Sequence, residues 1–410
     1  MSGGILIDRT LRAMIAEGAI QALVPVRPAQ VQPSSLDLRL GARVWQLQCS
    51  FLPGTAGVER KLGRLATAVH RLDRDEPIVL HRGGVYLAEI EEVLELPEGV
   101  WGRGNPKSST GRLDVFVRLL PEFGHAFDTV PAGYRGRLYL EITPQSFHVA
   151  VRRGDCLGQL RLARGRPQLG AAELEAWQAR APLCRWSDRS PAPVSTDDGP
   201  PSALLSVDLD PPEGPAGYLA RRHLPPVDLQ RRDLPVDRYW VPLPPAAAEG
   251  HVLEPEQFYV FATRETLCVP PELCAELVAF DATKGELRTH YAGFIDSGFG
   301  YDVDGKGPGE TARGMDDDAD AGKPRPTGSL PPLVDGVSAR LVRPGDTEAL
   351  VAAVRSILDD PVLAARLGEG ARAVAGHFGW DAIAAEHLRC YHDIIERWKP
   401  MRRGTDGNGA

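Results

Sequence analysis

The sequence has few cysteines, and none of them is spaced as in a zinc site. Its 410 residues contain six cysteines, no two of which form a C-x-x-C pair, and none of the ten histidines is followed two positions later by glutamate. These absences exclude the common zinc patterns, including the H-x-E and P-C-x-x-C signature of zinc-dependent nucleobase deaminases. We therefore expect no zinc and reduced, unpaired thiols.

The sequence also lacks a basic excess and a long apolar run. It carries 47 Lys and Arg against 55 Asp and Glu, for a net charge of -8 and a pI near 5.8, which argues against a general nucleic-acid binder. No charged-then-apolar signal opens the chain, and no apolar stretch approaches the ~18 residues of a membrane span. We expect a soluble cytoplasmic protein with no nucleic-acid or membrane partner.

Glycine and proline, with 43 and 36 residues, are plentiful and separate short apolar runs. Turn signals about every ten residues predict a mainly β sandwich or barrel rather than a doubly wound sheet. Helices are expected over residues 8–20 and 171–180, and Gly83-Gly84 is expected to form a hairpin turn. The expected strands are 36–40, 44–47, 78–80, 85–90, 93–96, 115–119, 138–142, 147–151 and 157–162.

The chain also repeats itself. Residues 80–97 align without gaps with residues 253–270, so that Tyr86 matches Tyr259 and Glu92 matches Glu265, and residues 294–300 are similar to the turn after Asp128. Chance similarity of two hairpins is the alternative, but matched order over two segments favours a second, degenerate copy of one fold. The expected domains are a catalytic domain 1–170, a helix and linker 171–202, a truncated second copy 203–302, a disordered linker 303–332 and a helical tail 333–400.

The tail has a different character from the rest of the chain. Helices are expected after a capping Asp346, from Pro361, and from Ala382 to about Trp398. The segments DGV at 335–337, LVRPGD at 341–346 and FGWD at 378–381 resemble the C-terminal end of GT-B glycosyltransferases. The glycine loop and paired glutamates of that family lie upstream of the part present here, so no transferase activity is expected.

Most of the chemistry lies in residues 107–141. This stretch opens with Lys107, Ser108 and Ser109, passes Asp128, and ends at Glu141 inside an otherwise apolar run. Cations and hydroxyls beside glycine suit a polyphosphate. Taken singly, the two serines also fit a polar turn, Asp128 a turn cap, and Glu141 the solvent face of a strand.

The order of these features resembles the dCTP deaminase family, which shares its trimeric β-fold with dUTPase. The shared features are a basic residue before Ser-Ser, an Arg-Leu pair, an Asp before a Gly-aromatic-x-Gly turn, and an apolar strand with Glu. The segments QPSSLDLRLG at 32–41 and RGDCLGQL at 153–160 extend the resemblance over about the first 165 residues. It implies a dUTPase-like β-clip or distorted barrel, duplicated, with a C-terminal α-helical fragment.

The resemblance also implies an activity, the hydrolytic deamination of dCTP to dUTP and ammonia, which supplies dUMP and dTMP. Glu141 would be the general base for water attacking C4, Ser108 would orient that water, and Arg112 would offset charge near the base. No protein ligand for a metal is implied, because Mg²⁺ would arrive with the triphosphate. The implied substrate-binding residues are Lys107, Ser108, Ser109, Thr110, Gly111, Arg112, Asp128, Tyr139, Leu140 and Gln159.

Assembly and regulation follow from the same resemblance. Sites of the family are built between subunits, so a homo-oligomer, in the family a homotrimer, is expected, with dTTP as a candidate inhibitor. The sequence departs from the family by having Lys107 in place of arginine and a longer loop at 120–124, and its second copy lacks the Lys-Ser-Ser cluster and a counterpart of Glu141. The alternatives are a dUTP diphosphatase, a bifunctional deaminase–diphosphatase, or a non-catalytic nucleotide-binding chimera.

Overall fold

The computed structural model describes residues 3–186, 190–195, 201–246, 250–278, 293–301 and 347–375. The chain divides into two units, Met1–Asp317 and Asp318–Ala410, which are described separately below. The expected linker 303–332, the capping Asp346 and the expected helix from Ala382 lie outside the described residues. Among the described residues, no helix is both long enough and apolar enough to cross a membrane.

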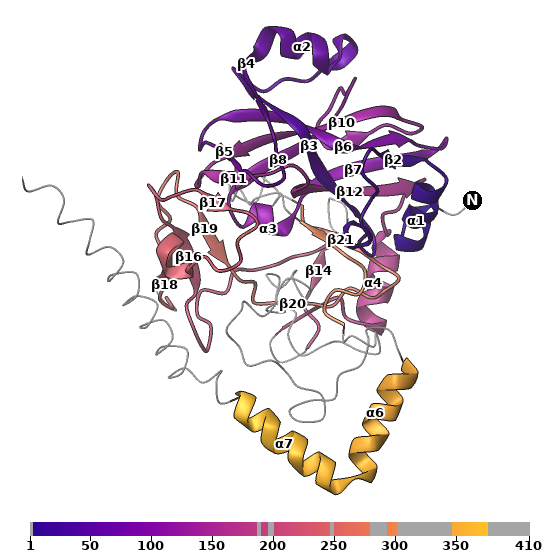
Figure 1. The fold of residues 1–410 in the computed structure, drawn as a ribbon, viewed down its shortest axis with the longest axis vertical. Helices are drawn as coiled ribbons and strands as arrows, with labels where there is room; N and C mark the ends of the chain where they lie inside the picture. Colours follow the sequence, from indigo (N-terminus) through magenta and orange to yellow (C-terminus); the bar gives the residue numbers. More distant parts are fainter. Residues whose placement is uncertain are drawn as a thin grey trace, which may run out of the picture. The chain divides into compact units, whose positions relative to one another are not determined.

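The first unit is built on a ten-stranded sheet whose main path runs β8-β10-β6-β3-β12-β7-β9 (Figure 1). Strands β7 and β8 also lie in contact, so the sheet curls into a nearly closed barrel. This architecture confirms the prediction of a mainly β fold with a distorted barrel. Its strands are β1 Gly4–Ile5, β2 Ile20–Ala22, β3 Leu36–Leu47, β4 Ala66–Arg71, β6 Val85–Glu95, β7 Val100–Pro106, β8 Val115–Pro121, β9 Thr129–Val130, β10 Arg135–Pro144 and β12 Cys156–Arg164.

Alternation along the strands divides the side chains between the barrel core and its outside. On β3 the leucines 36, 38 and 40 enter the main core, as do residues 138, 140 and 142 of β10 and residues 160 and 162 of β12. Successive side chains of a strand point to opposite faces. The polar residues between these leucines therefore point outward, and they include Asp37, Glu141 and Gln159.

Two short helices cover parts of this barrel. Helix α1, Asp8–Ala16, lies within the expected range 8–20 and buries Leu11 and Met14. It ends before Gly18, whose positive φ of 79° suits a turn. Helix α2, Val58–Leu65, was not predicted. Its Val58 and Leu62 join a second apolar cluster on the outer side of the barrel with Tyr139.

The prediction of a hairpin at Gly83-Gly84 was wrong in its pairing. The turn is present, with Gly83 at a φ of 76°, but β5 (Ile78–Leu80) pairs with β11 (Val149–Val151) instead of β6. Both edges of β6 are already taken by β10 and β3. With no free edge on β6, β5 joins a separate three-stranded sheet with β11 and β17 (Val227–Asp228).

The chain after α4 (Ala171–Arg180), a helix predicted with these bounds, forms small sheets of two or three strands. We propose that residues 203–302 are a reduced second copy, because two hydrogen bonds recur at the aligned positions. In the first copy, the Tyr86 hydroxyl accepts a hydrogen bond from the His81 N–H at 3.0 Å. At the aligned positions, the Tyr259 hydroxyl accepts one from the Glu254 N–H, also at 3.0 Å. Glu92 and Glu265 are both buried acceptors of backbone N–H groups. The elements here are β13 Cys184–Arg185, β14 Val194–Ser195, β15 Ser202–Ala203, β16 Gly217–Ala220, α5 Val236–Tyr239, β18 Trp240–Leu243, β19 Tyr259–Phe261, β20 Thr266–Leu267, β21 Ala275–Glu276 and β22 Phe294–Ile295.

The second unit contains two described helices, α6 (Thr347–Asp359) and α7 (Pro361–Ala375). They fall where the sequence predicts them. Asp360 caps α7, since its Oδ1 accepts the N–H groups of Val362 and Leu363 at 3.0 Å, and Pro361 occupies the first helical position.

Candidate active site

Glu141 is buried on the outer side of β10 and is held by one arginine. The antiparallel register sets Glu141 opposite Arg118 of β8, and both Nε, at 3.1 Å, and Nη2 of Arg118 donate to Glu141 Oε1. Glu141 is 2% exposed, and its Oε2 has no hydrogen-bond partner among the described residues. A buried carboxylate with one oxygen fixed and the other available is suited to accept a proton from a ligand or water.

Arg118 is itself held on two sides. Its Nη2 donates to Ser50 Oγ at 3.0 Å, and its guanidinium lies 3.7 Å from the centre of the Phe127 ring. Stacking on an aromatic face and a second acceptor leave the guanidinium little freedom. The sequence reasoning missed Arg118; the signal was a lone cation in the apolar run Val-Phe-Val-Arg-Leu-Leu.

Tyr139 and Leu140 precede Glu141 but face opposite ways. Tyr139 points outward beside Glu141, and its hydroxyl donates to Glu122 Oε2 at 2.7 Å. Burial, with the neighbouring Glu122 carboxylate, raises the pKa of Tyr139, so the hydroxyl stays a donor. Leu140 lies in the main core, and the backbone of both residues is in register with β6 and β8.

Asp128 joins two strands just beside this group. It adopts a left-handed φ of 56°, its N–H donates to Leu119 O at 2.8 Å, and its own carbonyl accepts from the Gly104 N–H at 3.0 Å. Its Oδ1 accepts from the Leu119 N–H at 2.7 Å. Burial raises the pKa of Asp128 to about 6, opposed by the Leu119 N–H and by Arg118. Arg118 therefore interacts with both carboxylates, through hydrogen bonds with Glu141 and through its charge with Asp128.

Lys107 stands at the end of β7 and precedes the single-turn helix α3, Ser108–Gly111. Its carbonyl accepts the N–H groups of Thr110 and Gly111 at 3.0 and 2.9 Å, which closes the turn, and Arg112 follows directly. Lys107 Nζ lies 2.5 Å from Asp37 Oδ2. The partner Asp37 was not among the predicted site residues, although it interrupts the leucines of the SSLDLRL run.

Asp37 is buried and only partly satisfied. Its Oδ1 has no partner among the described residues. Burial raises the pKa of Asp37, and Lys107 opposes that shift. A ligand with a donor or a cation would find an open oxygen here.

Gln159 of β12 lies next to this pair, opposite Asp37 of β3 on one side and Asn105 of β7 on the other. Its Oε1 accepts from Ser35 Oγ at 3.4 Å, and its Nε2 is 3.5 Å from Pro106 O. The polar side chains of these three strands thus share one outer surface, which we call the β3–β12–β7 face and which comprises Asp37, Gln159, Asn105, Arg161 and Arg103.

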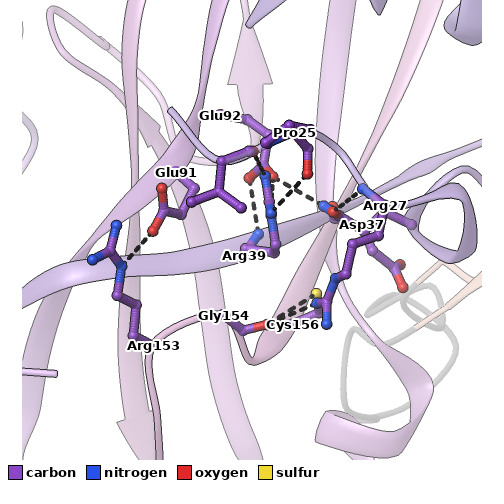
Figure 2. Close-up of polar contacts among 11 residues, drawn as sticks. Pro25, Arg27, Asp37, Arg39, Glu91, Glu92, Arg153, Gly154 and Cys156 are labelled. Carbon is purple, nitrogen blue, oxygen red and sulfur yellow. Dashed lines mark hydrogen bonds and ion pairs between the residues drawn. The ribbon is translucent and has the colours of Figure 1, made fainter. Parts of the chain in front are cut away.

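A buried ion pair braces the strand that carries Asp37 (Figure 2). Arg39, two residues further along β3, lies 2.7 Å from Glu92 Oε1 of β6, and both side chains are almost fully buried. Arg39 Nη2 also donates to Val24 O at 2.8 Å, and its backbone N–H to Glu92 Oε2 at 2.9 Å. A buried pair of this kind adds little over apolar packing, whereas loss of one partner would leave the other charge buried and unpaired.

The predicted residues therefore lie in two groups rather than one. Glu141 and Asp128 lie around Arg118, with Tyr139 on the same strand bonded to Glu122, whereas Lys107 and Gln159 lie around Asp37. In the sheet order, β10 and β12 are separated by β6 and β3, so Glu141 and Gln159 point outward on different sides of the barrel. Within the described parts of the chain, no cluster of three or more His, Cys, Asp or Glu residues could hold a metal ion.

Comparison with known proteins identifies the family. The model of the 2'-deoxycytidine 5'-triphosphate deaminase (DCD) N-terminal domain matches residues 2–166, and that of its C-terminal domain matches residues 171–314. The chain belongs to the dCTP deaminase family. It is an enzyme of that family, a hydrolase that acts on a C–N bond.

Individual family members match the chain as follows. It is 32% identical over 163 residues to a "dCTP deaminase, dUMP-forming" of Acidothermus cellulolyticus, covering 39% of this chain and 80% of that protein. A protein of the same description from Salinispora tropica is 36% identical over 139 residues, 34% of this chain and 68% of that protein. The crystal structure of the 2'-deoxycytidine 5'-triphosphate deaminase from Agrobacterium tumefaciens has a TM-score of 0.68 and 37% identity, over 75% of this chain and 88% of that chain.

Proposed function

We propose that this dCTP deaminase uses Glu141 as the general base for hydrolytic deamination of the cytosine ring. Water adds to C4, Glu141 accepts its proton through Oε2, and the proton passes to the amine, which leaves as ammonia. The observation that carries the proposal is the buried Glu141 with Oε1 fixed by Arg118 and Oε2 without a partner among the described residues. The Asp128 carboxylate is the proposed contact to the deoxyribose or base.

The first product of this step is dUTP, but the relatives named above are described as dUMP-forming. We therefore propose the bifunctional form, in which a second water attacks the α-phosphorus and releases dUMP and pyrophosphate. This replaces the simple dUTP product expected from the sequence.

The triphosphate is proposed to lie at Lys107, Ser108, Ser109 and Arg112, with Gln159 beside them. Two cations and two hydroxyls at the start of a turn suit phosphate oxygens. Mg²⁺ would be bound mainly by these oxygens and water. Asp37 would hold Lys107 in place through their ion pair, and Lys107 would in turn orient the triphosphate.

A site that uses both groups requires two protein surfaces, because Glu141 and the Lys107 group point outward from different sides of one barrel. We propose a homo-oligomer in which one chain offers the Glu141 surface and a neighbouring chain the Lys107 surface. The trimer expected from the family would supply such an arrangement, and dTTP would compete for the same site.

The test is turnover of dCTP with Mg²⁺ by the full chain and by Glu141→Gln, following ammonia, dUTP, dUMP and pyrophosphate separately. The matched control is Glu95→Gln, which changes an exposed glutamate of β6. We expect Glu141→Gln to lose about 100-fold or more in kcat, the usual range for a general base, with the control unchanged. Normal ammonia release by Glu141→Gln would refute the assignment, and dCTP binding without turnover by wild type would favour the non-catalytic alternative.

A further inference from the structure

The second half of the chain packs directly on the β3–β12–β7 face. Strands β21 and β22 pair with each other. Residues in and next to these strands contact β7, β12 and the residues just before β3. The Gly293 N–H donates to Asn105 Oδ1 at 2.8 Å, and Arg161 Nη1 donates to Ala275 O at 2.9 Å. Glu276 lies 3.5 Å from Arg103. These contacts join residues more than 100 positions apart, so they define a docked segment rather than a local turn.

Asp296 is the charged centre of this contact. Its Oδ1 accepts from Ser34 Oγ at 2.6 Å, lies 3.5 Å from Ser35 Oγ and 3.3 Å from Arg161 Nη2. Arg161 is 5% exposed, and its guanidinium lies 4.1 Å from the centre of the Phe294 ring. A cation buried this deeply needs a compensating charge. Asp296 is the carboxylate that supplies it.

The same contact reaches the proposed triphosphate site. Ser35 Oγ has a single proton, and both Gln159 Oε1, at 3.4 Å, and Asp296 Oδ1, at 3.5 Å, lie within reach of it. Gln159 in turn lies opposite Asp37, the partner of Lys107. Burial is the main cause of the raised pKa of Asp37, and the negative charge of Asp296 adds to it. Asp296 and Gln159 thus share the Ser35 hydroxyl, and Gln159 lies next to Asp37 in the register of β12 and β3.

We propose that the second half is a built-in wall of the dCTP site, in which Asp296 is a positioning residue that orients Gln159 through Ser35 and neutralises Arg161. The inference rests on the proposed function, because Gln159 and Lys107 are taken to bind the nucleoside triphosphate. It assigns a task to a half whose sequence has no Lys-Ser-Ser cluster and no counterpart of Glu141. Asp296 lies in the segment 294–300, whose sequence is similar to the turn after Asp128.

The test compares Asp296→Asn with Asp296→Glu in the full chain, with Asp233→Asn as control. Asp233 pairs with Arg231 in the same half, and both side chains are more than half exposed. We expect Asp296→Asn to raise KM for dCTP about five- to tenfold, the size of one ordinary hydrogen bond, with kcat within about twofold. Asp296→Glu should recover part of the loss, and the control should behave as wild type.

An unchanged KM in a folded Asp296→Asn, or an equal fall of kcat in Asp296→Asn and Asp296→Glu, would overturn the inference. If Asp296→Asn does not fold, Ser34→Ala removes the 2.6 Å bond to Asp296 and the 3.4 Å bond from Arg161 and should still raise KM. An unchanged KM in Ser34→Ala counts against the inference equally. Calorimetry with dCTP separates the two proposals. If the wild-type protein binds dCTP in a way that depends on Asp296 but does not turn it over, the proposed function is overturned and this inference is kept. If the protein turns dCTP over equally well with and without Asp296, this inference is overturned and the proposed function is kept.

Discussion

Replacement of Asp128 by asparagine should stabilise the protein and at the same time damage its activity. Asparagine has nearly the same shape, tolerates the left-handed φ of 56° at this position, and can keep its Oδ1 as acceptor of the Leu119 N–H. It differs in carrying no charge to bury. The substitution therefore isolates the cost of a buried carboxylate.

The size and sign of the effect follow from the raised pKa. Burial moves the pKa of Asp128 from 3.8 to about 6. Between these values the folded protein holds a proton that the unfolded chain has released, so stability falls as the pH rises from about 4 to about 6 and the full penalty applies above 6. Two pKa units correspond to about 3 kcal/mol. Because the new amide N–H₂ needs partners of its own, which costs about 1 kcal/mol, we expect a net gain of about 2 kcal/mol at pH 7.5.

Urea unfolding of wild type and Asp128→Asn at pH 7.5 and pH 4 measures this difference. The gain should be present at pH 7.5 and absent or reversed at pH 4, where the wild-type carboxyl is protonated. The exposed Asp75 offers a control, Asp75→Asn, which should change stability little at either pH. An Asp128→Asn protein no more stable than wild type at pH 7.5, or a gain equal at both pH values, would refute the reasoning. Turnover of dCTP should fall in the same variant if Asp128 contacts the substrate.

Two further predictions concern the surroundings of Glu141 and Asp128. Arg118→Met should lower the unfolding free energy by about 2 kcal/mol, which is less than for a fully buried pair because Arg118 is 37% exposed. Addition of Glu141→Gln should restore most of this loss when the double-mutant cycle is measured by urea unfolding. Simple additivity of the two substitutions would contradict the pairing. Gly104→Ala should lower the unfolding free energy by about 2–3 kcal/mol in the same assay, since a Cβ there would lie 2.4 Å from the Leu119 Cβ and 3.1 Å from Asp128 Oδ1. The control is Gly63→Ala in α2, where the added Cβ meets no atom within 4 Å and should stabilise the helix slightly.

Alternation within strands was readable from the sequence, and much of the barrel followed from it. The run Leu-Asp-Leu-Arg-Leu at 36–40 places its leucines in the core and its charges outside, and Leu-Tyr-Leu-Glu-Ile at 138–142 does the same. Local signals were enough for the helix 171–180 and for the start of α7 at Pro361. The strand expected at 138–142, which carries Glu141, lies within β10.

Pairing between distant segments was not readable in the same way. Nothing near Gly83 in the sequence reveals that both edges of β6 are occupied, so β5 was assigned to the wrong partner. Arg118 lies 23 positions from Glu141 and meets it only through the β8–β10 register. The docking of Asp296 on Ser34 spans 262 positions and depends on how the two halves pack.

The alternation that builds the barrel also explains why its chemistry lies on two surfaces. If leucines of β3, β10 and β12 fill one core, the polar residues between them must point outward, and a slip of one residue would exchange the two sets. Asp37, Gln159 and Glu141 are thus fixed on the outside by the same pattern that stabilises the inside. A polar surface of this kind becomes a desolvated site only when another surface covers it. The β3–β12–β7 face has such a cover in the chain itself, the segment around Asp296. On the other side of the barrel Glu141 is itself buried, and the more exposed group is Arg118, which bonds Glu141 and stacks on Phe127. The second chain proposed on that side would therefore cover Arg118 rather than Glu141.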